Sequence, residues 1–226
     1  MIMNRRFLRF LLASHVFVFS FIGCILAEGE HPPGTSPSPL QKETVLKEIR
    51  EPDVIYVPTP YKVVEKMLEL AKVKKTDVVY DLGCGDGRIV VTAALKYGCK
   101  GYGFDIDPKR VLESRQNVKK YNVGHLVKIE QKDIFKLDLS KANVVTLYLL
   151  PELNVKLIPQ LETLKPGSRI VSHDFGMKGI TPDKVIEISL DDVDEDYSNE
   201  EYDDFGEHKI YLWNIPLKKE KKAATD

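Results

Sequence analysis

The sequence predicts an α/β domain in which helices cover both faces of a seven-stranded, mostly parallel sheet. Between residues 77 and 172, short apolar runs alternate with segments of helical periodicity, which is the pattern of a parallel sheet. The last two apolar runs, Val185 to Leu190 and Lys209 to Ile215, have no helix between them and are expected to pair antiparallel. The 226 residues are 43% hydrophobic, which fits one globular domain and excludes a disordered chain.

Each element of the domain has a local signal. Thr59 and Pro60 are expected as N-cap and first-turn residue of a helix whose apolar face holds Val63, Val64, Met67, Leu68 and Ala71. The five parallel strands are expected at Asp77 to Tyr80, Gly101 to Phe104, Val127 to Glu130, Asn143 to Tyr148, and Arg169 to Ser172. The helices between them are expected at Arg88 to Tyr97, Pro108 to Tyr121, and Glu152 to Leu164, with Pro159 as a kink or break in the last.

The first 27 residues are unlike the rest of the chain. They hold three Arg, no Asp or Glu, and five of the nine Phe, and Phe10 to Leu26 is mostly apolar. This pattern predicts a signal peptide or a retained membrane anchor, so the protein is expected to be exported or membrane-anchored. The two alternatives stay open, because Ile25-Leu26-Ala27 resembles a signal-peptidase site while the apolar run nearly spans a bilayer. The orientation of an anchored body also stays open.

Residues 28–52 are expected to form a Pro-rich linker and a short helix near Gln41 to Ile49, residues 53–217 the folded domain, and residues 218–226 a frayed polar tail. Beyond residue 27 the chain carries 30 Lys and Arg against 34 Asp and Glu, a formal net charge of −4. This balance argues against a nucleic-acid partner.

The cysteines and histidines indicate no framework or metal site. Outside the first 27 residues, Cys84 and Cys99 are the remaining cysteines, and a disulfide between them is conceivable. The sequence has no Cys-x-x-Cys pair and its five His are scattered, so no metal site is predicted.

The strongest chemical signal is the turn that follows the first strand, Asp81-Leu82-Gly83-Cys84-Gly85-Asp86-Gly87-Arg88. Glycines at alternate positions between a strand and a helix let a ligand lie against bare backbone. A dinucleotide fingerprint needs a glycine where Arg88 stands, and the phosphate-binding ending Gly-Lys-Ser/Thr is missing. The turn therefore suits a ligand with a positive amino-acid end rather than a pyrophosphate.

Two acidic residues follow the next two strands. Asp105 is placed to accept hydrogen bonds from both hydroxyls of a ribose, and Asp133 to accept one from an adenine amino group. Ile106 and Ile134 then offer apolar faces to the base. The carboxyl ends of parallel strands meet at one edge of a sheet, so we expect these residues to lie together.

These motifs, Asp81 to Arg88, Gly103 to Pro108 and Gln131 to Phe135, resemble those of the class I S-adenosylmethionine-dependent methyltransferases, which have a Rossmann-like fold. The resemblance spans about Asp53 to Pro182. Within that class the chain is most similar to bacterial methyltransferase-domain proteins related to the mitochondrial protein-lysine methyltransferases. That closer likeness is carried by Tyr56-Val57-Pro58-Thr59-Pro60, Gly85-Asp86-Gly87-Arg88-Ile89-Val90 and Asn143-Val144-Val145.

The resemblance implies S-adenosylmethionine as the cofactor and assigns its contacts. Gly83 and Gly85 would pass under the methionine part beside Asp81, Asp105 would hold the ribose, and Ile106 would face the base. Asp133 and Ile134 would meet the adenine, and Thr59 would close over the methionine end.

The resemblance also implies methyl transfer to a protein substrate, with lysine as the expected acceptor. Candidate catalytic residues are Tyr148, Glu152, His173 and Asp174, at the ends of the fourth and fifth strands. His173 beside Asp174 suggests a base and its orienting group, but neighbours on a strand point to opposite faces, and a His packed under a loop is the plainer interpretation. A small-molecule methyltransferase and a binding protein without turnover stay open. An exported body would lack a methyl donor that is made in the cytosol, which favours the binding protein.

One late segment concentrates acidic charge. Asp191 to Glu207 holds ten Asp and Glu, together with Tyr197, Tyr202 and Phe205. It is either a solvated loop or a rim that attracts a Lys-bearing protein.

Overall fold

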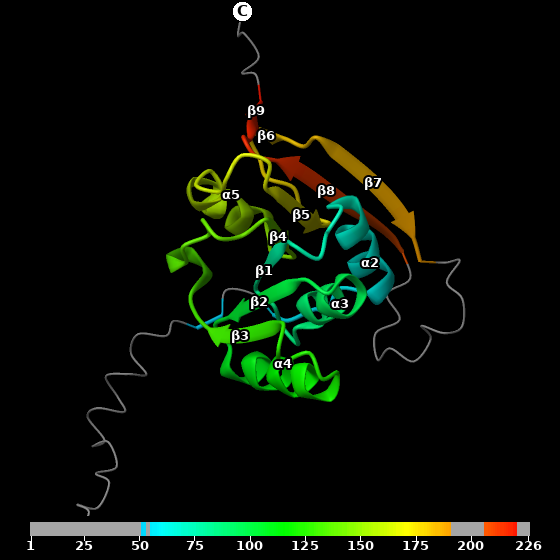
Figure 1. The fold of residues 1–226 in the computed structure, drawn as a ribbon. Helices are drawn as coiled ribbons and strands as arrows, with labels where there is room; N and C mark the ends of the chain where they lie inside the picture. The colour runs from blue at the N-terminus through cyan, green and yellow to red at the C-terminus, as the bar shows by residue number, and fades with distance from the viewer. Residues whose placement is uncertain (1–50, 53–54, 191–205, 221–226) are drawn as a thin grey trace, which may run out of the picture.

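The computed structural model describes residues 51–52, 55–190 and 206–220 (Figure 1). Its main sheet has seven strands in the order β3-β2-β1-β4-β5-β8-β7. These strands are β1 (Val78–Leu82), β2 (Lys100–Asp105), β3 (Val127–Gln131), β4 (Val144–Leu147), β5 (Arg169–His173), β7 (Lys184–Ser189) and β8 (Glu207–Asn214). Strands β1 to β5 are parallel, and β8 is antiparallel to both β5 and β7. The predicted fold class is confirmed.

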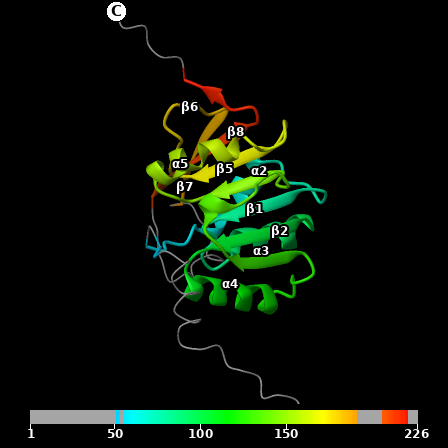
Figure 2. The same ribbon diagram turned by 90° about the vertical axis from the view of Figure 1, so that its left-hand side faces the viewer.

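Helices cover both faces of this sheet. Helices α2 (Tyr61–Leu70), α3 (Arg88–Tyr97) and α4 (Pro108–Lys120) pack on one face, and α5 (Pro151–Leu161) lies on the other with the 3-10 turn η1 (Ile134–Lys136) (Figure 1). Figure 2 shows the central strands side by side between these layers.

Alternation along the strands sends successive side chains to the two helical layers. Val144 packs with the α2–α4 side, and the next residue, Val145, packs with the α5 side. All four residues of β4 are buried, as expected for a central parallel strand covered on both faces.

Two predicted helix ends were wrong. Pro60, not Thr59, occupies the N-cap of α2, with no side-chain cap, because the Pro60 carbonyl accepts the first helical hydrogen bond, from Val64 N–H. Thr59 is instead buried. Helix α5 starts at Pro151 and does not break at Pro159, yet it ends two residues later at Leu161 rather than at Leu164. A proline lacks the N–H that bonds the preceding turn, so its cost is small in the last turn.

Two further predictions fail at the periphery. Lys218–Lys219 form β9, which pairs with β6 (Ile180–Thr181) in a two-stranded sheet, so the start of the tail is not frayed. Cys84 and Cys99 are buried free thiols and form no disulfide.

Several expectations fall outside the described residues. They are the N-terminal 27 residues, the linker, the helix near Gln41 to Ile49, and nearly all of the acidic segment. In the part of the chain that the structure does describe, no helix is both long and apolar enough to cross a bilayer.

A buried ion pair joins the starts of two strands. The Arg169 guanidinium, at the start of β5, donates to Asp77, one residue before β1, and also to the Ala71 carbonyl after α2 at 2.9 Å. Asp77 is 7% exposed and accepts a third bond, from Lys74 N–H, at 2.8 Å. This pair therefore holds α2, β1 and β5 together at the end of the sheet away from the Gly-rich turn.

We expect Arg169→Ala to lower the free energy of unfolding by about 3 kcal/mol, because it leaves the Asp77 carboxylate buried without its cation. Chemical denaturation measures this loss. The control is Lys66→Ala, which removes an exposed pair with Glu69 and should cost less than about 1 kcal/mol. Equal losses in the two variants would contradict a structural role for the buried pair.

Candidate functional site

A cavity of about 540 Å³ opens at the carboxyl ends of β1, β2 and β4. Strand order reverses between β1 and β4, the place where sheets of this kind bind ligands. Its walls come from residues 55–59, the Gly-rich turn, the end of β2, and the segments that follow β4 and β5. The volume lies in the range of small-molecule sites.

The Gly-rich turn shapes one wall. Gly83, Gly85 and Gly87 all have left-handed φ angles, of 81°, 53° and 79°, which favour glycine. A Cβ atom on Gly85 would lie 2.2 Å from Cε2 of Tyr56, so the Tyr56 ring packs directly over this glycine. Gly83 lines the cavity and Gly85 does not. A direct contact between Gly85 and a ligand therefore stays a prediction.

Asp105 is held at the end of β2 by the same turn. Its Oδ2 accepts from Gly85 N–H at 2.8 Å and its Oδ1 accepts from Asp107 N–H at 2.9 Å. Burial raises the pKa of this carboxyl above its usual value, against the lowering effect of the two backbone bonds. A carboxylate has about four acceptor positions, so two remain for a ligand. Asp105 and Ile106 both line the cavity, as their predicted ribose and base contacts require.

Asp133 is placed differently from its neighbour Ile134. The Asp133 side chain caps η1 by accepting from Phe135 N–H at 3.0 Å, and it is not among the cavity-lining residues. Ile134 does line the cavity. The structure thus brings the apolar member of the pair to the wall and turns the acid toward its own backbone.

Asp81 is the most unusual polar group in the wall. It is 2% exposed, and its Oδ1 accepts from Thr146 Oγ1 at 2.6 Å while its Oδ2 has no hydrogen-bond partner among the described residues. Burial raises the pKa of Asp81 to about 7, and the bond from Thr146 opposes that rise. A buried acceptor without a donor fits a ligand that brings a cationic amino group, such as the methionine end of S-adenosylmethionine.

Residues 55–60 form a strap over the Gly-rich turn. Nη1 of Arg88 donates to the Thr59 carbonyl at 2.9 Å, while its Nε donates to Asp86 at 3.1 Å. The guanidinium of Arg110 lies 4.5 Å from the centre of the Tyr56 ring. Within this strap the sequence predicts a site role for Thr59 alone. The run Tyr56-Val57-Pro58-Thr59-Pro60 is a signal for the strap, but not for the contact of Tyr56 with Gly85.

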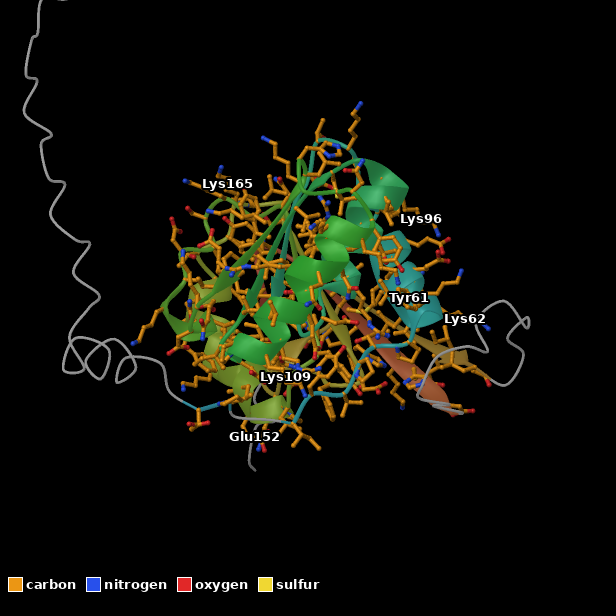
Figure 3. All side chains as sticks on the ribbon, turned by 90° about the horizontal axis from the view of Figure 1, so that it is seen from below. Tyr61, Lys62, Lys96, Lys109, Glu152 and Lys165 are labelled. Atoms are coloured by element: carbon orange, nitrogen blue, oxygen red, sulfur yellow. The ribbon has the colours of Figure 1, made fainter. Side chains whose placement is uncertain are left out.

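The four candidate catalytic residues separate into two groups. Tyr148 lines the cavity, and its ring is stacked with that of Phe175, at 6.0 Å between centres. Glu152 is exposed, lies at the outer edge of the molecule in Figure 3, and is absent from the cavity wall. His173 and Asp174 are also absent from the wall, and His173 is fully buried under Tyr148, 4.0 Å away between ring centres.

His173 and Asp174 do not point apart as the strand rule predicts. Strand β5 ends at His173, and Asp174 has a φ of 53°, so its carboxylate turns back to lie 3.2 Å from Nε2 of His173. Sequence reasoning missed His208 of β8, whose Nδ1 lies 2.9 Å from the same Nε2. Burial lowers the pKa of His173 to about 4, against the opposing effect of Asp174, so its imidazole is neutral at pH 7.

Comparison with known proteins gives a consistent result. The family model of the ANTKMT methyltransferase domain matches residues 81–184. A protein-lysine N-methyltransferase from Saccharolobus islandicus is 48% identical over 139 residues, which cover 61% of this chain and 86% of that protein. An ATP synthase lysine N-methyltransferase of Xenopus laevis is 30% identical over 139 residues, 61% of each chain.

A solved structure is similar along nearly its whole length. It is described as an RNA methyltransferase from Salinibacter ruber in complex with S-adenosyl-L-homocysteine. It is 45% identical, with a TM-score of 0.61, and the match covers 75% of this chain and 98% of that one.

We expect Gly85→Ala to weaken binding of S-adenosylhomocysteine by about tenfold or more, because the added methyl group displaces the Tyr56 ring from the turn. Gly179→Ala is the matched control, since Gly179 has a similarly left-handed φ of 85° and nothing within 4 Å of the added Cβ. Calorimetric titration measures both affinities. If the two variants bind alike, the Tyr56 contact has no part in the site.

We expect the affinity for S-adenosylhomocysteine to fall as the pH drops below about 7, by up to about tenfold per pH unit. The ammonium group of the ligand pairs with ionised Asp81, so protonation of that carboxyl competes with binding. Asp81→Asn should bind more weakly and lose this pH dependence. Thr146→Val removes a bond that lowers the Asp81 pKa, so it should move the transition to higher pH; an unmoved transition would exclude Asp81 as its source.

Proposed function

The chain belongs to the class I S-adenosylmethionine-dependent methyltransferases, in the family of the Saccharolobus protein-lysine N-methyltransferase, and on this basis we propose that it methylates lysine side chains of a protein. The observation that carries the proposal is the composition of the cavity beyond Asp81. The wall that follows β4 and β5 consists of aromatic and aliphatic side chains, Tyr148, Leu149, Leu150, Leu153 and Phe175. Such a wall suits the long apolar stem of lysine.

The residues present fit the cofactor of the family. Asp81 and Gly83 would hold its amino-acid end, Asp105 its ribose, and Ile106 and Ile134 its base. When bound, S-adenosylmethionine supplies an electrophilic methyl group on a sulfonium centre.

The chain's contribution to the acceptor is desolvation and orientation. A lysine amine must lose its proton before it can act as a nucleophile, and an apolar wall disfavours the charged form and so lowers the amine pKa. Tyr148 is the candidate residue that reaches this wall, and its ring is held between Phe175 and the buried His173. We assign it the role of positioning the acceptor amine.

RNA is the second candidate acceptor, because the Salinibacter structure is described as an RNA methyltransferase. Two features favour protein over RNA. Residues 28–226 carry a formal net charge of −4, which repels phosphate backbones. The acceptor end of the cavity is also apolar, whereas the acidic segment Asp191 to Glu207, most of which lies outside the described residues, suits a Lys-bearing partner.

We expect the full chain, given S-adenosylmethionine with an isotopically labelled methyl group and an extract of its native cells, to label protein. The label should be sensitive to protease, resistant to ribonuclease, and recovered as methyl-lysine by mass spectrometry. Asp105→Ala is the control, because it removes the ribose acceptor and should reduce the labelling strongly. Label recovered in RNA or in a small molecule would overturn the proposal, and binding of the cofactor without transfer would identify a binding protein.

The N-terminal segment determines where this activity takes place. We propose that residues 1–27, which lie outside the described residues, carry the body to the membrane or across it, as their three Arg and apolar run predict. Mass spectrometry of the native N-terminus separates the two fates. A mature chain that starts at Glu28 identifies a cleaved signal, and a retained Met1 to Ala27 identifies an anchor.

A further inference from the structure

Three side chains outside the cavity wall converge on one point behind it. They are His173 at the end of β5, Asp174 directly after it, and His208 of the neighbouring strand β8. The distance from His173 Nε2 to His208 Nδ1 is 2.9 Å, and each of these nitrogens lies 3.2 Å from Asp174 Oδ2. The two histidines are buried, while the Asp174 side chain is 27% exposed and faces the way in from solvent.

Protons alone cannot satisfy this triangle. Each contact needs a proton on one atom and a lone pair on the other, and a carboxylate oxygen offers only lone pairs. If both nitrogens carry protons toward Asp174, two N–H groups face each other across 2.9 Å. If one nitrogen carries a proton, the other directs a lone pair at the carboxylate from 3.2 Å. One edge of the triangle is repulsive in either arrangement.

A metal cation removes the conflict, because it attracts all three lone pairs at once. At the usual distance of about 2.1 Å from each atom, the ion would stand about 1 Å above the plane of the triangle. The angles between its bonds would be about 90° to 100°, which matches one face of an octahedron. Two imidazoles and one carboxylate in this arrangement leave the remaining positions for water.

Neighbouring groups orient two of these ligands, as they do in metal sites. The other ring nitrogen of His173 lies 3.3 Å from the hydroxyl of Thr59. The second oxygen of Asp174 accepts from Lys209 N–H at 2.9 Å, and the left-handed backbone of Asp174 turns its carboxylate toward the two rings. The backbone strain at Asp174 therefore serves to close the triangle.

We propose that His173, Asp174 and His208 bind one divalent first-row transition ion, for which Zn²⁺ is the test ion. Imidazole nitrogens favour such ions over Mg²⁺ and Ca²⁺, which prefer oxygen ligands. The site joins β5 to β8 and reaches the cavity wall through Thr59. It is independent of the identity of the methyl acceptor.

The test uses the full chain without an affinity tag, treated with a chelator and then titrated with ZnCl₂. Calorimetry should give one site that is absent from Asp174→Asn, and thermal unfolding should shift to higher temperature with Zn²⁺ but not with Mg²⁺. The exposed His125 supplies the control, because His125→Gln should keep the site. An absent site in the unaltered chain, an unchanged site in Asp174→Asn, or an equal shift with Mg²⁺ would each overturn the proposal.

A second readout separates metal binding from a purely structural role. Asn keeps the shape of Asp but adds N–H donors, which can pair with a ring nitrogen and relieve the repulsive edge. The metal-free Asp174→Asn variant should therefore unfold at a temperature no lower than that of the metal-free parent. A marked loss of stability without metal would show that the three side chains are satisfied by hydrogen bonds alone and would overturn the metal site.

Discussion

The left-handed backbone of the Gly-rich turn is the constraint on which the rest of the site depends. Gly85 has no Cβ, and in its place lies the ring of Tyr56, at a separation that no other residue would allow. The N–H of the same glycine holds Asp105 at the end of β2. One position without a side chain thus places both an aromatic roof and an acidic wall of the cavity, which is why so short a turn can organise a cofactor site.

The strap of residues 55–60 connects this turn to the far strands of the sheet. Its Thr59 carbonyl accepts from Arg88 at the start of α3, and its Thr59 hydroxyl meets His173 at the end of β5. The strap therefore contacts both the cofactor side and the acceptor side of the cavity. A change in the state of His173 would be felt at the wall through a chain of two contacts, with Tyr148 stacked on the same imidazole.

Asp81 and the triangle of His173, Asp174 and His208 both hold polar atoms that the described residues do not satisfy. The Oδ2 atom of Asp81 is buried at the cavity wall without a donor. The triangle is satisfied by no placement of protons on its three members. The buried charge of Asp77, by contrast, is paired within the chain. Local rules are broken where a ligand supplies what is missing, which is the general expectation for functional sites.

The sequence by itself determined the layered α/β architecture, the Gly-rich turn and the acid at the end of β2, because hydrophobic period, glycine spacing and strand ends are local properties. It did not determine the contacts of Tyr56 with Gly85 or of His208 with His173. Those partners are far apart in the chain, and only packing of the strap and pairing of β5 with β8 brings them together. The strand rule also failed at Asp174, because period-two alternation stops where the strand ends and a left-handed residue reverses the side chain. Local order was thus readable from residues, whereas the convergence of distant side chains was decided by the tertiary structure.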